Sequence, residues 1–307
     1  MRKVGIIGLG HVGVTVAYTL LTKGIVDELV LIDQNENKVM AEYYDFIDTI
    51  GRLDTDTKIK VQDYNELKDA DILVTAFGDI KASVEQGDRF AELPINTKNA
   101  KEIGPKIKAS GFNGIIINIA NPCDVVADLL RQTAGLSSKQ VFGTGTFLDT
   151  ARMQRAVGQA IGQSPRSVSG YVLGEHGDSQ FTAWSTVIVD GQSIDNLVEE
   201  YHLDLPKLDE QAKSGAWKVA NGKGYTSYAI STCAVKMIQA VFSDAHLFMP
   251  ASVYVDRFGG YVGYPAVIGA NGVEKVVSLP LTKDEDEKLT KSATMIKEKT
   301  ENAIDEI

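Results

Sequence analysis

The sequence has little of three features that mark particular classes of protein. Only two of its 307 residues, Cys123 and Cys233, are cysteines, so no disulfide framework is indicated and a reducing compartment fits best. The cysteines and the four histidines show none of the close spacings that bind a metal ion. No apolar run approaches the ~18 residues that cross a bilayer, and no small-residue cleavage site follows the basic start at Arg2 and Lys3. We therefore expect a cytoplasmic protein that binds no membrane.

Positive charge is also scarce. The 31 Lys and Arg residues are outnumbered by 41 Asp and Glu residues, which gives a net charge of −10. Such a balance argues against nucleic acid or an anionic membrane surface as a partner, and an anionic substrate would need positive groups placed locally. Hydrophobic residues make up 44% of the chain, which suffices for the cores of two domains.

The first 33 residues carry a pattern typical of dinucleotide binding. An apolar run at 4–7 precedes G-x-G-x-x-G at 8–13, a helical pattern follows to about residue 24, and a second apolar run at 29–32 ends on Asp33. The motif alone is weak, but strand before, helix after and an acid closing the next strand together indicate a βαβ unit that binds a dinucleotide. A glycine-rich turn in an unrelated βαβ unit is the alternative.

Each glycine of the motif has a physical reason to be there. Gly8 permits the tight turn, Gly10 lets a pyrophosphate approach the backbone, and Gly13 lets the helix pack closely on the strand. The helix N-terminus then offers free N–H groups to the phosphates. We expect His11 and Val12, which complete the loop, to contact the cofactor with the glycines.

Asp33 predicts which dinucleotide binds. Its carboxylate would accept hydrogen bonds from the two ribose hydroxyls and would repel a 2′-phosphate. No Arg or Lys follows it until Lys38, so NAD is favoured over NADP.

The first half of the chain alternates strands and helices. Strands are expected at 4–7, 29–32, 58–61, 72–77, 115–120 and 141–143. Helices are expected at 37–50, 96–109 and 122–133, with a helix-start signature at Asp63 and Glu66. This alternation predicts an α/β fold with a Rossmann-type doubly wound parallel sheet, and we assign residues 1–144 to an NAD-binding domain.

Around Gly145 the pattern changes. We expect helices at 149–162 and 225–242, strands at 167–173 and 186–189, and antiparallel strands within 252–279 joined by a hairpin turn at Asn271-Gly272. A capping box at Thr282 and Glu285 should open a C-terminal helix. Residues 145–307 are therefore predicted to form an α+β substrate domain with antiparallel strands, with a cleft between the two domains.

Two polar segments follow strands of the predicted sheet, where such sheets present their sites. The segment from Gly78 to Arg89 is polar and bounded by glycine, so it is a candidate lid with Arg89 at its far end. An Arg after a loop is more often a solvated charge. Asn121, before Pro122, offers a donor and an acceptor at the sheet edge. Local sequence favours a plain helix start, with Asn as cap and Pro at the first helical position.

Two further segments carry groups suited to proton transfer and anion binding. Asp149 and Arg152 share one face of a predicted helix, a pattern that is more often a surface ion pair. His176 lies between Gly174 and Gly177 after a strand, where its ring can reach a cleft, although a hydrogen-bonded turn histidine is the alternative. Histidine is the side chain best suited to exchange a proton near neutral pH.

Together these residues form a plausible hydride-transfer site. NAD moves a hydride, and reduction of a C=O or oxidation of a C–OH also needs a proton donor or acceptor at the oxygen, which His176 can be. Asp149 can orient the imidazole and favour its charged form. One Arg can grip a carboxylate with two parallel hydrogen bonds, and a second can polarise the carbonyl.

These residues resemble the L-lactate/malate dehydrogenase family, in the family's order and over the whole chain. The matching motifs are Gly8-x-Gly10-x-x-Gly13, Asp33, Gly87-Asp88-Arg89, Asn121-Pro122, Gly145-Thr146-x-Leu148-Asp149-x-Ala151-Arg152, Gly174-Glu175-His176-Gly177-Asp178-Ser179 and Gly224-Tyr225-Thr226-Ser227.

The resemblance implies an L-specific 2-hydroxy acid dehydrogenase. In it, His176 would be the acid/base, oriented by Asp149, and Arg152 would bind the substrate carboxylate. Arg89 would close with the lid and polarise the carbonyl, and Asn121 would lie beside the nicotinamide and the substrate oxygen. The family also implies a homodimer or homotetramer.

The substrate side chain is less clear. By resemblance, Thr226 would line the pocket. The start of the lid, residues 80–82, holds neither the Arg usual for malate nor the Gln usual for lactate, although Lys81 there could bind an acid. The motifs at 87–92, 151–158 and 170–177 look most similar to the L-2-hydroxyisocaproate dehydrogenase branch, which implies medium-sized, branched or aromatic 2-oxo acids such as 2-oxoisocaproate. L-lactate or malate dehydrogenase is the alternative, and a non-catalytic NAD-sensing protein is a remote one.

Overall fold

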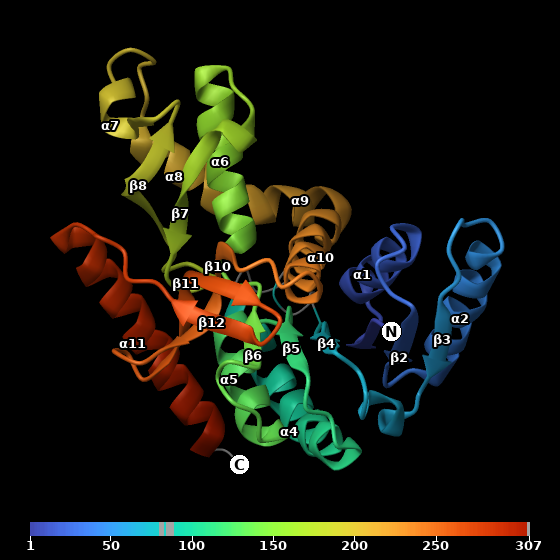
Figure 1. Cartoon of the computed structure of the whole chain (residues 1–307). Coiled ribbons are helices and arrows are strands. Elements are labelled where there is room, and N and C mark those ends of the chain that lie inside the picture. Colours follow the sequence, from blue (N-terminus) through green and yellow to red (C-terminus); the bar gives the residue numbers. More distant parts are fainter. Residues whose placement is uncertain (80–82, 84–88, 306–307) are drawn as a thin grey trace.

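The computed structural model describes residues 1–79, 83 and 89–305. Over these residues the chain forms two sheets of very different size (Figure 1). The larger has nine strands in the order β12-β11-β10-β6-β5-β4-β1-β2-β3, and the smaller has three in the order β7-β8-β9. No helix among the described residues is both long enough and apolar enough to span a membrane.

The first six strands form the parallel part of the large sheet. They are β1 (Lys3–Ile7), β2 (Glu28–Ile32), β3 (Lys58–Val61), β4 (Ile72–Thr75), β5 (Ile115–Asn118) and β6 (Val141–Gly143). All neighbouring pairs among them run parallel, which confirms the predicted doubly wound sheet. The apolar strands are buried at every position, whereas β3 alternates exposed and half-buried residues because it is an edge strand.

Helices connect these strands. They are α1 (His11–Thr22), α2 (Glu36–Ile50), α4 (Leu93–Ser110) and α5 (Cys123–Ala134), with the 3-10 helices η1 (Tyr64–Leu67) and η2 (Arg89–Glu92). Right-handed crossovers put α1 and α2 on one face, and because the strand order reverses at β4, α4 and α5 cover the other. The helix start at Asp63 is real, since its side chain accepts a hydrogen bond from the Asn65 N–H at 2.9 Å, but the helix is only one 3-10 turn.

The second half contributes the remaining elements. They are α6 (Phe147–Ile161), η3 (Pro165–Ser167), β7 (Val168–Leu173), β8 (Phe181–Val189), β9 (Gln192–Ser193), α7 (Ile194–Leu197), α8 (Leu205–Lys213), α9 (Gly215–Lys223), α10 (Tyr228–Phe242), β10 (Leu247–Val255), β11 (Gly260–Gly269), β12 (Gly272–Val276) and α11 (Lys283–Asp305). The capping box that opens α11 is present: the Thr282 N–H donates to the Glu285 carboxylate at 2.9 Å, and the Glu285 N–H donates to Thr282 Oγ1 at 3.3 Å. Helices α7, α8 and α9 were not predicted from the sequence, because these short segments show no clear periodic pattern of apolar residues.

The antiparallel strands do not form a separate layer. Strand β10 pairs with β6, with Ser252 opposite Gly143, so β10, β11 and β12 extend the large sheet across the expected division at residues 144 and 145. The main hydrophobic core is continuous over this joint. A second, smaller core lies among α6, β7, β8 and α8, which stand apart from the large sheet in Figure 1.

Candidate active site

A cavity of about 340 Å³ opens at the carboxyl ends of the parallel strands, near the point where the strand order reverses between β1 and β4. Open α/β sheets bind their ligands at such a point. Eight of the predicted site residues line it: Gly10, His11, Val12, Gly78, Asn121, Arg152, His176 and Thr226. Residues of α9 and α10 also line the cavity, so both halves of the chain contribute.

The three glycines of the loop after β1 are needed for three different reasons. Gly8 has φ +96°, and a Cβ there would lie 2.5 Å from the Phe77 nitrogen. A Cβ at Gly13 would lie 1.9 Å from the Gly8 carbonyl oxygen, so α1 packs too closely on the loop for any side chain. A Cβ at Gly10 would meet nothing within 4 Å. Gly10 therefore faces open space at the start of α1, which leaves room beside the helix N-terminus, where anions bind favourably.

Asp33 is held beside this loop. Its Oδ2 accepts a hydrogen bond from the Leu9 N–H at 2.6 Å, and its Oδ1 accepts one from the Asn35 N–H at 2.9 Å. The Gln62 amide binds the main chain of Asp33 on both sides, at 3.0 and 2.8 Å. The carboxylate thus anchors the glycine loop, and a carboxylate has further lone pairs with which it could accept from ribose hydroxyls.

His11 packs against the other half of the chain. Its ring stacks on Tyr225 with centroids 3.5 Å apart and planes 2° from parallel. The Lys223 ammonium lies over the Tyr225 ring at 4.5 Å and over the Tyr228 ring at 3.6 Å. This cluster connects the glycine loop to the α9–α10 connection, which carries Thr226 into the cavity wall.

The catalytic candidates lie together as the sequence indicated. Asp149, in the first turn of α6, is fully buried, and its Oδ2 lies 2.5 Å from Nδ1 of His176. Arg152, one turn later, donates to the other carboxylate oxygen at 2.8 Å. With its amide nitrogen toward Asp149, Gln180 donates to both oxygens at 3.1 Å. The Arg152 and His176 side chains are only 11% and 12% exposed, so Asp149 and Arg152 are not a surface ion pair, and the hydrogen-bonded His176 is at the cavity wall.

Asn121 also departs from the plain helix-start interpretation. Pro122 itself occupies the N-cap position of α5, and Asn121 precedes the helix and lines the cavity. Its carbonyl oxygen accepts a hydrogen bond from the Asn96 amide at 2.6 Å. Of the other predicted residues, Lys81 lies outside the described residues, and Arg89 is described only by its backbone, at the start of η2.

Several wall residues were not foreseen. Phe77, Leu148, Trp217 and Ile230 give the cavity apolar surfaces, and Glu92 adds a buried carboxyl group. Burial raises the pKa of Glu92 despite a 3.0 Å hydrogen bond from Ser83 Oγ. No local pattern distinguishes these residues, because the wall forms where segments that are distant in the sequence pack together.

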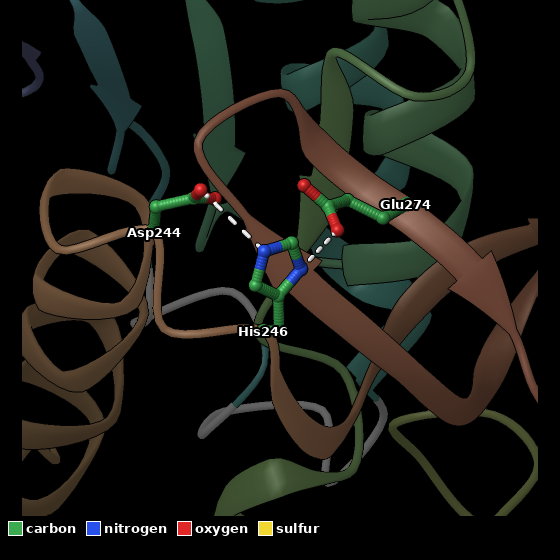
Figure 2. A group of neighbouring side chains, drawn as sticks. All are labelled: Asp244, His246 and Glu274. Atoms are coloured by element: carbon green, nitrogen blue, oxygen red, sulfur yellow. Dashed lines mark ion pairs between the residues drawn. The ribbon is translucent and has the colours of Figure 1, made fainter.

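A second polar cluster lies away from this cavity, where the turn after α10 meets β12. Figure 2 shows the imidazole of His246 between the carboxylates of Asp244 and Glu274. Nε2 of the ring lies 3.4 Å from Asp244, and Nδ1 pairs with Glu274. These atoms are close enough together to share a cation. Because each ring nitrogen already faces a carboxylate, we interpret the cluster as an ion-pair bridge between the turn and the strand.

Comparisons with known proteins agree with this geometry. The model for the NAD-binding domain of lactate/malate dehydrogenase matches residues 2–143, and the model for the alpha/beta C-terminal domain of the same enzymes matches residues 146–307. L-lactate dehydrogenase 1 of Bifidobacterium longum is 36% identical, over 99% of this chain and 98% of that protein.

Solved structures agree as well. The minor L-lactate dehydrogenase from Enterococcus mundtii, in a ligands-bound form, has a TM-score of 0.91 and 32% identity over 98% of each chain. The malate dehydrogenase of Cryptosporidium parvum has a TM-score of 0.90 and 26% identity, over 99% of this chain and 100% of that one. Family models that together span nearly the whole sequence, and relatives of matching length, lead to one conclusion: the chain belongs to the lactate/malate dehydrogenase family and is an NAD-dependent oxidoreductase that acts on 2-hydroxy acids.

Proposed function

We propose that this enzyme interconverts an L-2-hydroxy monocarboxylic acid and its 2-oxo acid, with L-lactate and pyruvate as the first candidate pair. The observation that carries the proposal is the grouping of His176, Asp149 and Arg152 in one cavity with the glycine loop. A proton-transfer pair, an anion-binding cation and a phosphate cradle are together what a hydroxy-acid dehydrogenase needs, and a protein that only binds NAD needs the cradle alone.

The cofactor would be held mainly by residues 1–144 and the substrate mainly by residues 145–307. Gly10, His11 and Val12 would bind the pyrophosphate, Asp33 the ribose hydroxyls, and Gly78 would let the backbone approach the cofactor. When bound, the nicotinamide supplies or accepts the hydride. Its position beside Asn121 would place the hydride transfer within reach of His176.

His176 would move the proton. Its Nδ1 is held by the buried Asp149 at 2.5 Å, so Nε2 is the nitrogen left to face the substrate oxygen. In reduction, protonated His176 donates from Nε2 to the carbonyl oxygen as the hydride arrives, and in oxidation neutral His176 accepts the hydroxyl proton. The Asp149 carboxylate stabilises the imidazolium and holds the ring orientation in both directions.

Two arginines would act on the two ends of the substrate. Arg152, on the cavity wall, would bind the substrate carboxylate with parallel N–H groups, a fit that its planar guanidinium gives and an ammonium does not. Arg89 would polarise the carbonyl when the lid closes. Thr226 would contact the substrate from the α9–α10 connection.

The described walls favour one carboxylate on the substrate rather than two. Among residues with described side chains, Arg152 is the only lysine or arginine that lines the cavity, whereas Asp79 and Glu92 add acidic groups. A second substrate carboxylate would therefore meet acids rather than a second cation, unless Lys81 supplies it. This supports a lactate-type substrate over malate.

A second candidate is a larger 2-oxo acid such as 2-oxoisocaproate. The relatives reported above carry the names of lactate and malate dehydrogenases, which supports lactate better. However, Ala216 and Ala220 leave space in the α9 wall, and Trp217 and Ile230 make it apolar, so a branched side chain could be accommodated.

A substrate panel tests the proposal. NADH oxidation is followed with pyruvate, 2-oxoisocaproate, phenylpyruvate and oxaloacetate, and kcat/KM is compared. We expect pyruvate or a larger monocarboxylic 2-oxo acid to exceed oxaloacetate by at least about tenfold. Preference for oxaloacetate would refute the single-carboxylate proposal, and no turnover with any 2-oxo acid would refute the enzyme assignment.

A pair of histidine variants tests the proton-transfer role. His176→Ala should lower kcat by about a hundredfold or more, because the proton must then come from water. His246→Gln is the matched control: that histidine also pairs with carboxylates but lies outside the cavity, so its kcat should stay unchanged. Equal losses in the two variants would contradict the assignment of His176.

Assembly and location stay predictions. We propose a homodimer or homotetramer in the cytoplasm, as the family resemblance implies. Light scattering coupled to gel filtration would measure the assembly directly, and a monomer at micromolar concentration would contradict it.

A further inference from the structure

A buried carboxyl group lies next to the main chain of His176. It has no part in the proposed proton transfer. Asp124, in the first turn of α5, is only 2% exposed. Its Oδ2 accepts a hydrogen bond from the backbone N–H of His176 at 3.0 Å, and its Oδ1 accepts one from Ser252 Oγ at 2.6 Å. One side chain thus joins α5, β10 and the segment that carries the candidate acid/base.

The far end of this connection cannot easily move. Ser252 is fully buried on β10, opposite Gly143 of β6. A Cβ at Gly143 would lie 3.0 Å from the Cβ of Ser252, and a Cβ at Gly145 would lie 2.3 Å from the Ser252 nitrogen. Because the backbone and Cβ of Ser252 are packed this closely, its hydroxyl is held within hydrogen-bond distance of the Asp124 carboxyl group.

Several charged groups surround His176. Among the described residues, Asp149 of α6 pairs with the ring and Arg152 pairs with that carboxylate, Asp124 of α5 accepts from the His176 N–H, and Glu175 and Asp178 flank His176 in the sequence. The net shift in the pKa of Asp124 is upward: burial is the largest cause and Asp149 adds to it, and the hydrogen bonds from Ser252 and His176 offset only part of the rise. Above that pKa Asp124 is ionised, and its negative charge beside His176 favours the protonated imidazole.

We infer that Asp124 is a positioning residue for the reaction: it fixes the main chain of His176 while Asp149 fixes its ring, and its negative charge favours the protonated ring. Two independent attachments leave the imidazole little freedom, which matters because a displacement of about 1 Å can cost about a hundredfold in rate. The inference rests on the proposed role of His176 as the acid/base.

Two substitutions at this position separate geometry from charge. Asp124→Ala removes both acceptors and should lower kcat by about ten- to a hundredfold, with little change in KM for NADH. Asp124→Asn keeps an acceptor for the His176 N–H and can donate to Ser252 Oγ, so kcat at low pH should return to within about threefold of the wild type.

The pH dependence of kcat/KM tests whether the negative charge of Asp124 affects the protonation of His176. Reduction of the 2-oxo acid needs protonated His176, so its kcat/KM falls as the pH rises through the pKa of that ring. Removing a nearby negative charge disfavours the imidazolium, so in Asp124→Asn this fall should occur at a lower pH, by about half a unit or more. A purely structural role would leave the midpoint unchanged.

The control lies one turn further along the same helix. Asp128→Asn removes a carboxylate that pairs with Arg131 at 2.7 Å, and should leave kcat and the pH midpoint at wild-type values. If Asp124→Ala does not fold, Ser252→Ala is a second test. It removes only the hydrogen bond from Ser252 Oγ to Asp124, and it should lower kcat while the fold is retained.

Three results would overturn the inference: wild-type kcat in Asp124→Ala, an Asp124→Asn variant whose kcat is not restored, or an unshifted pH midpoint in Asp124→Asn. Each of these requires a wild-type enzyme that reduces a 2-oxo acid. Loss of that wild-type activity would instead refute the proposed function, so the two failures are distinguishable.

Discussion

Two glycines three residues apart should respond in opposite ways to the same substitution. Gly10→Ala places a methyl group in open space, since nothing lies within 4 Å of the position. Alanine is a poorer N-cap than glycine, which costs a few tenths to about 1 kcal/mol, and it lowers the entropy of the unfolded chain by a similar amount. The stability of Gly10→Ala should therefore stay within about 1 kcal/mol of the wild type.

The same methyl group should weaken cofactor binding. It would occupy the space beside the helix N-terminus that we assign to the pyrophosphate, so the Kd for NADH should rise at least about tenfold, or about 1.4 kcal/mol. Gly13→Ala should behave differently, because its Cβ would lie 1.9 Å from the Gly8 carbonyl oxygen and α1 would have to move. We expect a loss of about 3 kcal/mol of stability or more.

Thermal unfolding followed by circular dichroism and NADH titration followed by fluorescence measure the two effects separately. The reasoning is refuted if Gly10→Ala binds NADH as tightly as the wild type. It is also refuted if Gly13→Ala unfolds at the wild-type temperature, because the helix would then have room for a side chain.

Three further substitutions test the cavity. Asp149→Asn should lower kcat by about a hundredfold or more, because the ring of His176 loses its charged partner. An unchanged rate constant in single-turnover experiments would contradict this. Arg152→Gln should raise KM for the 2-oxo acid by about ten- to a hundredfold while NADH affinity is retained, since a charged hydrogen bond to the substrate is lost together with the 2.8 Å contact to Asp149; unchanged KM would exclude the carboxylate role. Burial raises the pKa of Glu92, so its ionisation destabilises the folded state as the pH rises above about 4.5, the value for an unperturbed glutamate. Glu92→Gln should therefore melt at a higher temperature than the wild type at pH 7 and show a smaller difference at pH 4.

Much of the fold followed from local pattern. Buried strands such as β4 and β5 are short apolar runs, and no other soluble structure accommodates them as well as a sheet covered on both faces. The helix start at Asp63 was predicted correctly, but α7 to α9 were missed, because short or charged helices lack a clear apolar stripe. The joining of β10 to β6 had no local signal either, since Ser252 and Gly143 are 109 positions apart in the printed sequence.

The site shows the same division. Gly8, Gly10 and Gly13 were interpretable because the constraint on each is local: a turn, a helix start and a close packing contact. The pairing of Asp149 with His176 could be proposed from residue chemistry, but its 2.5 Å contact depends on how β7 packs against α6.

The sequence by itself therefore determined the strand–helix alternation, the glycine loop and the candidate reacting side chains, because these depend on residues within one or two elements. Only the tertiary structure decided that Arg152 is buried rather than exposed, that Asn121 lines the cavity rather than capping α5, and that the Asp124 carboxyl group accepts a hydrogen bond from the His176 N–H. The burial of a side chain, its place in the cavity wall and its long-range hydrogen bonds depend on segments that are distant in the sequence. A local sequence pattern therefore does not predict them.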